Sequence, residues 1–208
     1  MRATNIATGG ISAVLAAALM LSTGPREISV ASEHTGDTEI SSALESFSEN
    51  GHHNLAAFTY DDGEARFGGL GADEHTEFEI GSITKTFNAE LVRQFIDADE
   101  LSLDTQVQEL IDVPSAPVAD VTIEELLNHT SGLAATESLS LADMFAANIR
   151  DGGNPYRRDT PQDILEAAGA AELNYRGEEQ YSNYGHALLG QLLATHAGVP
   201  YDELLRTR

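Results

Sequence analysis

The sequence predicts an α+β fold in which an N-terminal β-hairpin precedes a mostly helical lobe. Two apolar runs, at 54–60 and 64–69, are separated by the turn residues Asp61-Asp62-Gly63, which is typical of antiparallel strands joined by a tight turn. Most later segments carry apolar residues at helical spacing. Because a lone two-stranded hairpin is marginal in water, we expect the C-terminal strands of the sheet to be missing from these 208 residues.

A helix is predicted on each side of the hairpin. The first lies within residues 38–50, where apolar side chains recur at helical spacing until Gly51. The second begins near Gly81 and should be buried on at least one face. The apolar positions of this second helix are Ile83, Phe87, Leu91, Val92, Phe95 and Ile96.

Beyond Asp99 we expect short helices. Thr122 and Glu125 have the spacing of a capping box, and Thr160-Pro161 offers a hydroxyl cap followed by proline at the first helical position. Further helices are expected at residues 141–149, 183–197 and 201–208. The helix at 183–197 carries a stripe formed by Leu188, Leu189, Leu192, Leu193 and His196, and Gly198 should end it.

Composition excludes several classes of function. The chain has no cysteine, which excludes disulfide scaffolds, thiolate metal clusters and cysteine nucleophiles. Its 34 acidic residues outnumber 11 Lys and Arg, for a net charge of -23, which argues against a nucleic-acid partner. The histidines show no metal-ligand spacing, and His52-His53 falls in a predicted turn. We therefore expect no metal ion.

The N-terminus has the pattern of an export signal. Arg2 precedes the apolar run 11–21, and small residues at Ser29 and Ala31 suit a signal peptidase. The alternatives are a membrane anchor or a buried N-terminal helix, but this run is shorter than the roughly 20 residues that span a bilayer. We expect a cleaved signal peptide at 1–31, a polar linker at 32–37, and a secreted or cell-envelope protein without a membrane span.

Ser82 and Lys85 are the first candidates for chemistry. Residues three apart on a helix share a face, so the Lys85 amine can lie beside the Ser82 hydroxyl and help to deprotonate it. Burial of apolar residues on both sides of Lys85 would favour its neutral form. A serine at a helix start also places free backbone N–H groups near an oxyanion. The alternative is that Ser82 caps the helix and Lys85 is a surface lysine.

The second and third candidates are loop segments. In Tyr181-Ser182-Asn183, the phenol can relay a proton and the amide can hold a substrate carbonyl, although this segment can equally cap a helix and pack its tyrosine. His129 and Ser131 form the third. Residues two apart on a helix do not face each other, so a helix end with polar residues is the expected structure there.

Together these segments resemble the serine β-lactamase and penicillin-binding-protein superfamily. The resemblance is to the branch containing class C β-lactamases and related D-alanyl-D-alanine carboxypeptidases and esterases, and it covers roughly residues 38–208. After the hairpin, the matching segments are F-E-I-G-S-I-T-K-T-F-N-A at 78–89, L-S-L-D at 101–104, L-L-N-H-T-S-G-L at 126–133 and Y-S-N-Y-G-H-A-L-L-G at 181–190.

The resemblance implies a β-lactamase/transpeptidase-like fold and a role for four residues. Ser82 would be the acylated nucleophile, Lys85 the group that helps to deprotonate it, and Tyr181 a proton carrier, while Asn183 would orient the substrate amide. The family reaction is acyl transfer through a covalent acyl-enzyme without metal or cofactor. Substrates would be a β-lactam, a D-Ala-D-Ala peptide or a small ester, and the sequence leaves these open.

The resemblance also implies a missing part. The family's third motif, K-T-G or H-x-G, lies on a later strand, and this chain ends at Arg208 before that strand. Removal of one oxyanion-hole donor typically costs about 10²–10³ in rate. We therefore expect the 208 residues alone to fold poorly and to be inactive. The alternative is a non-catalytic binding or regulatory relative, or a decayed gene fragment, with the same fold.

Overall fold

A computed structural model describes residues 31–48, 54–113, 115–136, 156 and 159–208. The chain divides into two compact units that part between Glu79 and Ile80. The predicted helix at 141–149, the turn at His52-His53 and nearly all of the predicted signal peptide lie outside the described residues. No helix among the described residues has the length and apolar character needed to cross a membrane.

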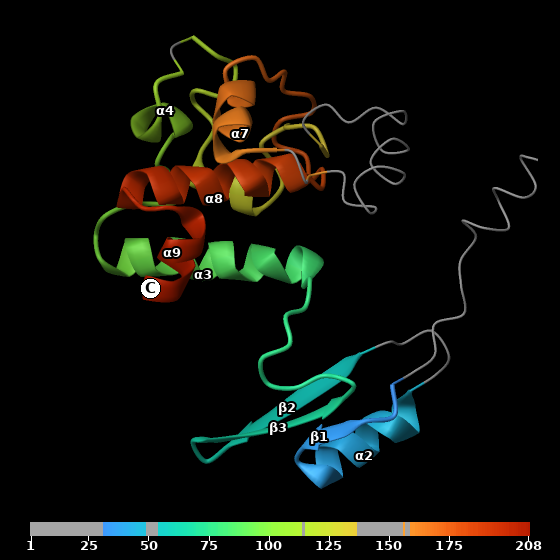
Figure 1. Ribbon diagram of the computed structural model, residues 1–208. Coiled ribbons are helices and arrows are strands. Elements are labelled where there is room, and N and C mark those ends of the chain that lie inside the picture. The colour runs from blue at the N-terminus through green and yellow to red at the C-terminus, as the bar shows by residue number, and fades with distance from the viewer. Residues whose placement is uncertain (1–30, 49–53, 114, 137–155, 157–158) are drawn as a thin grey trace, which may run out of the picture. The chain divides into compact units, whose positions relative to one another are not determined.

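The first unit is a three-stranded antiparallel sheet with one helix packed against it (Figure 1). The strands β2 (Leu55–Asp61) and β3 (Glu64–Leu70) form the predicted hairpin. The strand β1 (His34–Gly36) pairs with the other edge of β3, which gives the order β1-β3-β2. The segment 32–37, expected as a linker, is therefore partly a strand. Main-chain hydrogen bonds form this pairing, so its polar side chains gave no sign of it.

Helix α2 (Thr38–Phe47) begins at Asp37, whose carboxylate accepts the backbone N–H groups of Glu39 and Ile40. The helix packs closely on β3 at a residue without a side chain. A Cβ atom on Gly68 would lie only 2.6 Å from the Cβ atom of Ile40. Glycine at position 68 thus allows the close approach of helix and strand.

The second unit is helical, and α8 (Asn183–Ala197) runs through its middle (Figure 1). Helices α3 (Thr84–Asp97) and α9 (Tyr201–Thr207) contact one side of α8, while α4 (Val107–Leu110) and α7 (Pro161–Ala168) contact the other. Helix α5 (Ile123–Leu127) also packs on α8. A 3₁₀ turn, η1 (Gly81–Ile83), leads directly into α3.

Burial in this unit follows the predicted apolar stripe of α8. The four leucines of that stripe are fully buried, at 0% exposure, whereas His196 remains outside the core. In α3 the buried residues run from Asn88 to Phe95, whereas Ile83, just before the helix, and Phe87 are 59% and 47% exposed. The predicted buried face is therefore confirmed at Leu91, Val92 and Phe95, whereas Ile83 and Phe87, which the pattern assigned to the same face, are exposed.

The local signals at the helix ends are confirmed. Thr122 and Thr160 each form a capping box with the residue three positions later. Gly198 adopts a left-handed conformation, with φ of 69°, and ends α8. These boundaries depend on hydrogen bonds between residues close in sequence, which explains why the pattern alone located them.

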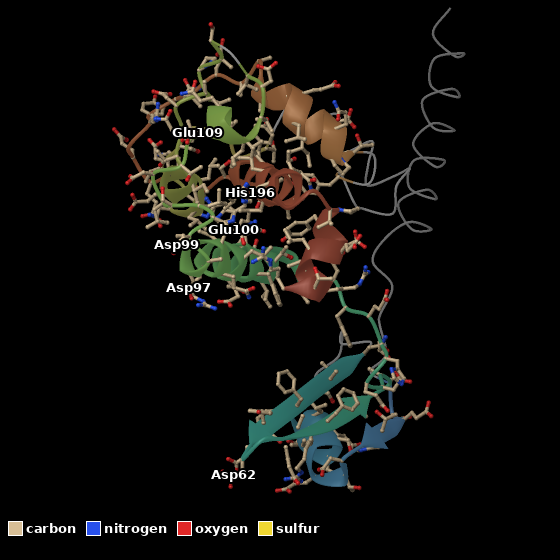
Figure 2. The ribbon with its side chains drawn as sticks, turned by 90° about the vertical axis from the view of Figure 1, so that its left-hand side faces the viewer. Asp62, Asp97, Asp99, Glu100, Glu109 and His196 are labelled. Carbon is tan, nitrogen blue, oxygen red and sulfur yellow. The ribbon has the colours of Figure 1, made fainter. Side chains whose placement is uncertain are left out.

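The excess of negative charge lies on the surface of both units. Asp62 occupies the tip of the hairpin, and Asp97, Asp99 and Glu100 gather where α3 ends (Figure 2). A helix C-terminus disfavours negative charge. At Glu100 this is offset by Arg208, whose guanidinium lies 3.1 Å from the carboxylate.

Candidate active site

Ser82 lies in the 3₁₀ turn η1, one residue after Gly81, whose φ of 53° is in the region that favours glycine. The residue before the first turn of α3 is Ile83, and it makes no side-chain cap. The alternative interpretation, in which Ser82 caps this helix, is therefore wrong. Among the described residues no acceptor faces the Ser82 backbone N–H, so this donor is available to a ligand.

Tyr181 and Asn183 flank the residue that caps α8. Ser182 is only 1% exposed, and its hydroxyl accepts the N–H of Gly185 at 2.8 Å and donates to the carbonyl of Ala134 at 2.6 Å. The Tyr181 side chain, in contrast, is 52% exposed. The cap thus fixes the loop at Ser182 and leaves the tyrosine outside the core, so the alternative in which Tyr181 is an ordinary packed residue is not found.

Four predicted side chains, from the segments where α3 and α8 begin, meet in one cluster. The Ser82 Oγ lies 2.7 Å from the Tyr181 hydroxyl oxygen and 3.2 Å from the Lys85 Nζ. The same Nζ donates to the Asn183 Oδ1 at 2.7 Å. Ser82 and Tyr181 are 99 residues apart in sequence, so the packing of α3 against α8 creates this cluster.

The electrostatics of the cluster depend on Lys85. Its Nζ lies 4.8 Å from the centroid of the Tyr181 ring, a cation–π distance. Hydrogen bonding to Lys85, and then to Ser82, lowers the pKa of the Tyr181 phenol. The expected burial on both sides of Lys85 is not found, since Ile83 and Phe87 are exposed. Contact with Lys85 and Ser82 therefore makes the Tyr181 phenol easier to ionise than a free tyrosine.

Asn88, which the sequence patterns did not single out, links α3 to α8 and α9 through hydrogen bonds. This side chain is 3% exposed, and its Nδ2 donates to the backbone carbonyl of His186 in α8 at 2.9 Å. Its Oδ1 accepts from the Tyr201 hydroxyl of α9 at 2.6 Å. A lone polar residue on the buried side of an apolar helix was the available signal.

His129 lies beside Tyr181, a contact that no sequence pattern predicted. The predicted end of α5 is confirmed, and His129 follows it with a φ of 59°. Its ring lies 4.6 Å from the Tyr181 ring and 4.7 Å from the His186 ring, measured between centroids. The pairing with Ser131 that the sequence disfavoured is not seen, since the recorded bond of the Ser131 hydroxyl is with the N–H of Leu133.

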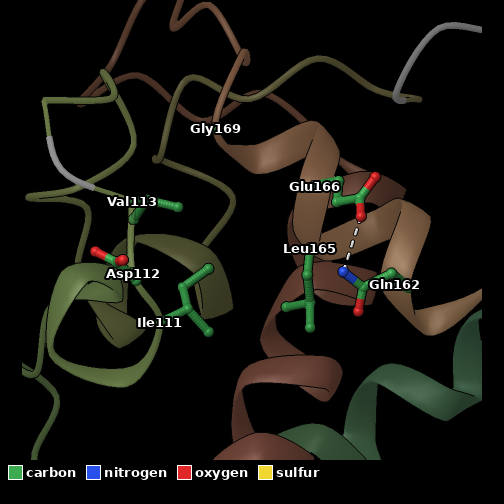
Figure 3. A pocket seen from close by; sticks show the side chains of 7 residues that line it. All are labelled: Ile111, Asp112, Val113, Gln162, Leu165, Glu166 and Gly169. Carbon is green, nitrogen blue, oxygen red and sulfur yellow. Dashed lines mark hydrogen bonds between the residues drawn. The ribbon is translucent and has the colours of Figure 1, made fainter.

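A separate cavity of about 270 Å³ lies between the segment after α4 and helix α7 (Figure 3). Ile111, Val113 and Leu165 supply its apolar lining, and Gln162 donates to Glu166 at 2.8 Å beside it. None of the four clustered side chains lines this cavity. Within the described part of the chain, no three His, Asp or Glu side chains gather as metal ligands.

The comparisons with known proteins agree on one family. The family model described as Beta-lactamase matches residues 40–208. Penicillin-binding protein 4 of Amycolatopsis lactamdurans is 32% identical over 80% of this chain and 41% of its own length. The chain thus spans about two fifths of that relative.

Two solved structures resemble the protein in fold. A D-stereospecific amidohydrolase from Streptomyces sp. matches with a TM-score of 0.55 and 28% identity, over 74% of this chain and 48% of that one. A class C β-lactamase from Rhodobacter sphaeroides matches with a TM-score of 0.52 and 22% identity, over 74% and 42%. The resemblance found in the sequence is confirmed: this chain belongs to the β-lactamase family, within the serine β-lactamase and penicillin-binding-protein superfamily.

Proposed function

We propose that this protein is an exported serine hydrolase that forms an acyl-enzyme on Ser82. The observation that carries the proposal is the contact of one serine hydroxyl with both an amine and a phenol, at 3.2 and 2.7 Å. Two groups able to exchange protons with a hydroxyl are what an activated serine requires. The substrate is an amide or ester carbonyl, in a β-lactam, a D-Ala-D-Ala peptide or a small ester.

In the first half of the reaction, Tyr181 starts as the phenolate, the Ser82 oxygen attacks the substrate carbonyl, and the Ser82 proton passes to the Tyr181 oxygen. Lys85 donates hydrogen bonds to Ser82 and Asn183, and its contact with Tyr181 lowers the pKa of the phenol, so Tyr181 rather than Lys85 takes the proton. The free N–H of Ser82 donates to the developing oxyanion. The phenol then returns the proton to the leaving amine or alcohol as the carbonyl–leaving-group bond breaks.

In the second half, water attacks the acyl-enzyme while Tyr181 accepts one of its protons. The Ser82 oxygen leaves and takes that proton back, which regenerates the starting state. Asn183 accepts from Lys85 through its Oδ1, and we assign its Nδ2 as the donor to a carbonyl of the substrate.

A covalent label tests this proposal. We expect a fluorescent penicillin or a fluorophosphonate to mark the purified protein, with the adduct on Ser82 by mass spectrometry. Ser82→Ala should abolish the label, and Tyr181→Phe should slow it by about 10²-fold or more because one proton carrier is lost. Ser102→Ala, an exposed serine outside the cluster, is the matched control. A protein that no acylating probe marks on Ser82 would be a non-catalytic binding or regulatory relative.

We further propose that residues 1–208 alone turn over substrate poorly, since they span 41% of the penicillin-binding relative. Reading the coding sequence beyond Arg208 tests this. An open frame that encodes a K-T-G or H-x-G box, and whose product hydrolyses nitrocefin or a p-nitrophenyl ester much faster than the 208-residue chain, is the expected result. Turnover by the 208-residue chain well above its Ser82→Ala control would refute it.

The export proposal rests on the N-terminal pattern of Arg2, an apolar run and small residues. Expression with and without residues 1–31, followed by fractionation and N-terminal sequencing, tests it. We expect export of the longer form and a mature terminus near Ser32. A full-length protein retained inside the cell with an intact Met1 would contradict the proposal.

A further inference from the structure

Both residues that flank Tyr181 donate their backbone N–H groups to a single residue, His129. The N–H of Gln180 bonds the His129 carbonyl oxygen at 2.8 Å, and the N–H of Ser182 bonds the His129 Nδ1 at 3.1 Å. The tyrosine between them is therefore held at both ends by one histidine. His129 has a left-handed φ of 59°, and its carbonyl and its ring both bond the segment around Tyr181.

The His129 imidazole also contacts the Tyr181 ring, with 4.6 Å between the ring centroids. The rings of His129 and Tyr181 are inclined at 38°, and the His186 ring also contacts the His129 ring, at an angle of 48°. His186 is 6% exposed and bonds the Leu127 carbonyl at 3.3 Å, so this ring is itself anchored. Together these contacts determine where the Tyr181 hydroxyl lies relative to Ser82.

The hydrogen bond from Ser182 requires one protonation state. Nδ1 accepts an N–H only when it carries no proton, so the imidazole is neutral with its proton on Nε2. In the imidazolium, two donors would face each other across the 3.1 Å between Nδ1 and the Ser182 nitrogen. Protonation would therefore break the bond that holds the C-terminal side of Tyr181.

We propose that His129 is the positioning residue for Tyr181, that its neutral imidazole holds the phenol against Ser82, and that its protonation releases the tyrosine. This inference rests on the proposed role of Tyr181 in proton transfer. His129 makes no contact with Ser82 or Lys85 among the recorded hydrogen bonds, so it acts through the tyrosine.

The charges around His129 favour its working state at neutral pH. Burial, and then the positive charge of Lys85 on α3, lower the pKa of His129, while Glu179 in the same loop as Tyr181 opposes them. His186 on α8 titrates lower still, with a pKa of about 4. The release should thus occur as the pH falls below the ordinary histidine value near 6.5.

Two substitutions separate the hydrogen bond from the ring. His129→Asn keeps an acceptor on Cγ in place of Nδ1 and tolerates a left-handed φ, whereas His129→Ala keeps neither acceptor nor ring. We expect His129→Ala to lower the rate constant of Ser82 acylation by a fluorescent penicillin by about 10- to 100-fold with little change in probe affinity. His129→Asn should retain most of the rate at pH 7.5. His196→Asn, on an exposed histidine of α8, is the matched control.

The pH profile gives the second readout. Between pH 8 and 5 the unmodified protein should lose acylation rate on the acid side. His129→Asn should lose less, because it has no imidazole to protonate and only protonation of the Tyr181 phenolate remains. Equal rates in all three proteins, or the same acid limb with His129→Asn, would overturn the inference.

A spectroscopic readout is independent of activity and of variant folding. Nitrogen-15 NMR of the unmodified protein should show His129 as the tautomer with its proton on Nε2, and the Ser182 amide should shift as that ring titrates. A proton on Nδ1, or an indifferent Ser182 amide, would refute the positioning role. If no probe labels wild-type Ser82, the proposed function fails, while the NMR result still decides whether His129 holds the Tyr181 segment.

Discussion

Replacement of Asn88 by alanine should weaken the attachment of α3 to α8 and α9, and the structure sets the size of the effect. The change removes two hydrogen bonds, to the His186 carbonyl and from the Tyr201 hydroxyl, each contributing about 1 kcal/mol. It leaves a Tyr201 hydroxyl in a half-buried site without that partner, which costs about 1 kcal/mol more. The higher helix propensity of alanine returns about 0.6 kcal/mol. The expected loss is about 2.5 kcal/mol.

A double-mutant cycle tests the reasoning. Asn88→Ala, Tyr201→Phe and the double variant are compared by urea unfolding followed by far-ultraviolet circular dichroism, with the slope m unchanged. Because Tyr201→Phe removes the group that Asn88→Ala orphans, the two losses should overlap by about 1 kcal/mol or more. Gln94→Ala, which removes a half-exposed amide from the same helix, should cost a few tenths. A loss below about 0.5 kcal/mol for Asn88→Ala, or strict additivity, would refute the account.

Three further outcomes follow from single contacts. Arg176→Ala should lower the free energy of unfolding by about 1–2 kcal/mol, because the Arg176 guanidinium forms a bidentate pair with Glu125 in which its Nε lies 2.7 Å from the carboxylate. Arg176→Lys cannot rebuild this pair, and full stability of Arg176→Ala in urea would contradict the prediction. Gly68→Ala should destabilise the first unit by about 1–3 kcal/mol through its clash with Ile40, seen as earlier proteolysis of residues 32–79. Burial lowers the pKa of His186 to about 4, so the unfolded state binds more protons between about pH 6.5 and 4 and stability falls as the pH falls. This fall in the free energy of unfolding is at most about 1.4 kcal/mol per pH unit. A urea midpoint that stays constant from pH 7 to 5 would exclude this contribution of His186.

The sequence alone was sufficient wherever structure depends on near neighbours. The hairpin turn at 61–63, the capping boxes and the leucine stripe of α8 are all contacts within about four residues, or periodicities of one element. Resemblance to a family supplied what local patterns could not, namely that Tyr181 belongs with Ser82. The residues by themselves had left Tyr181 as an ordinary neighbour of a helix cap.

Only the tertiary structure decided how that cluster is held. The pairing of β1 with β3, the bond from Asn88 to α8 and the contacts of His129 with the Tyr181 segment join residues that are between 32 and 98 positions apart in the sequence. A main-chain hydrogen bond or a ring contact leaves no periodicity in the sequence, because it depends on where whole elements pack. The residue types in the sequence therefore determined the chemistry of the candidate site, and the packing of α3, α5 and α8 determined its geometry.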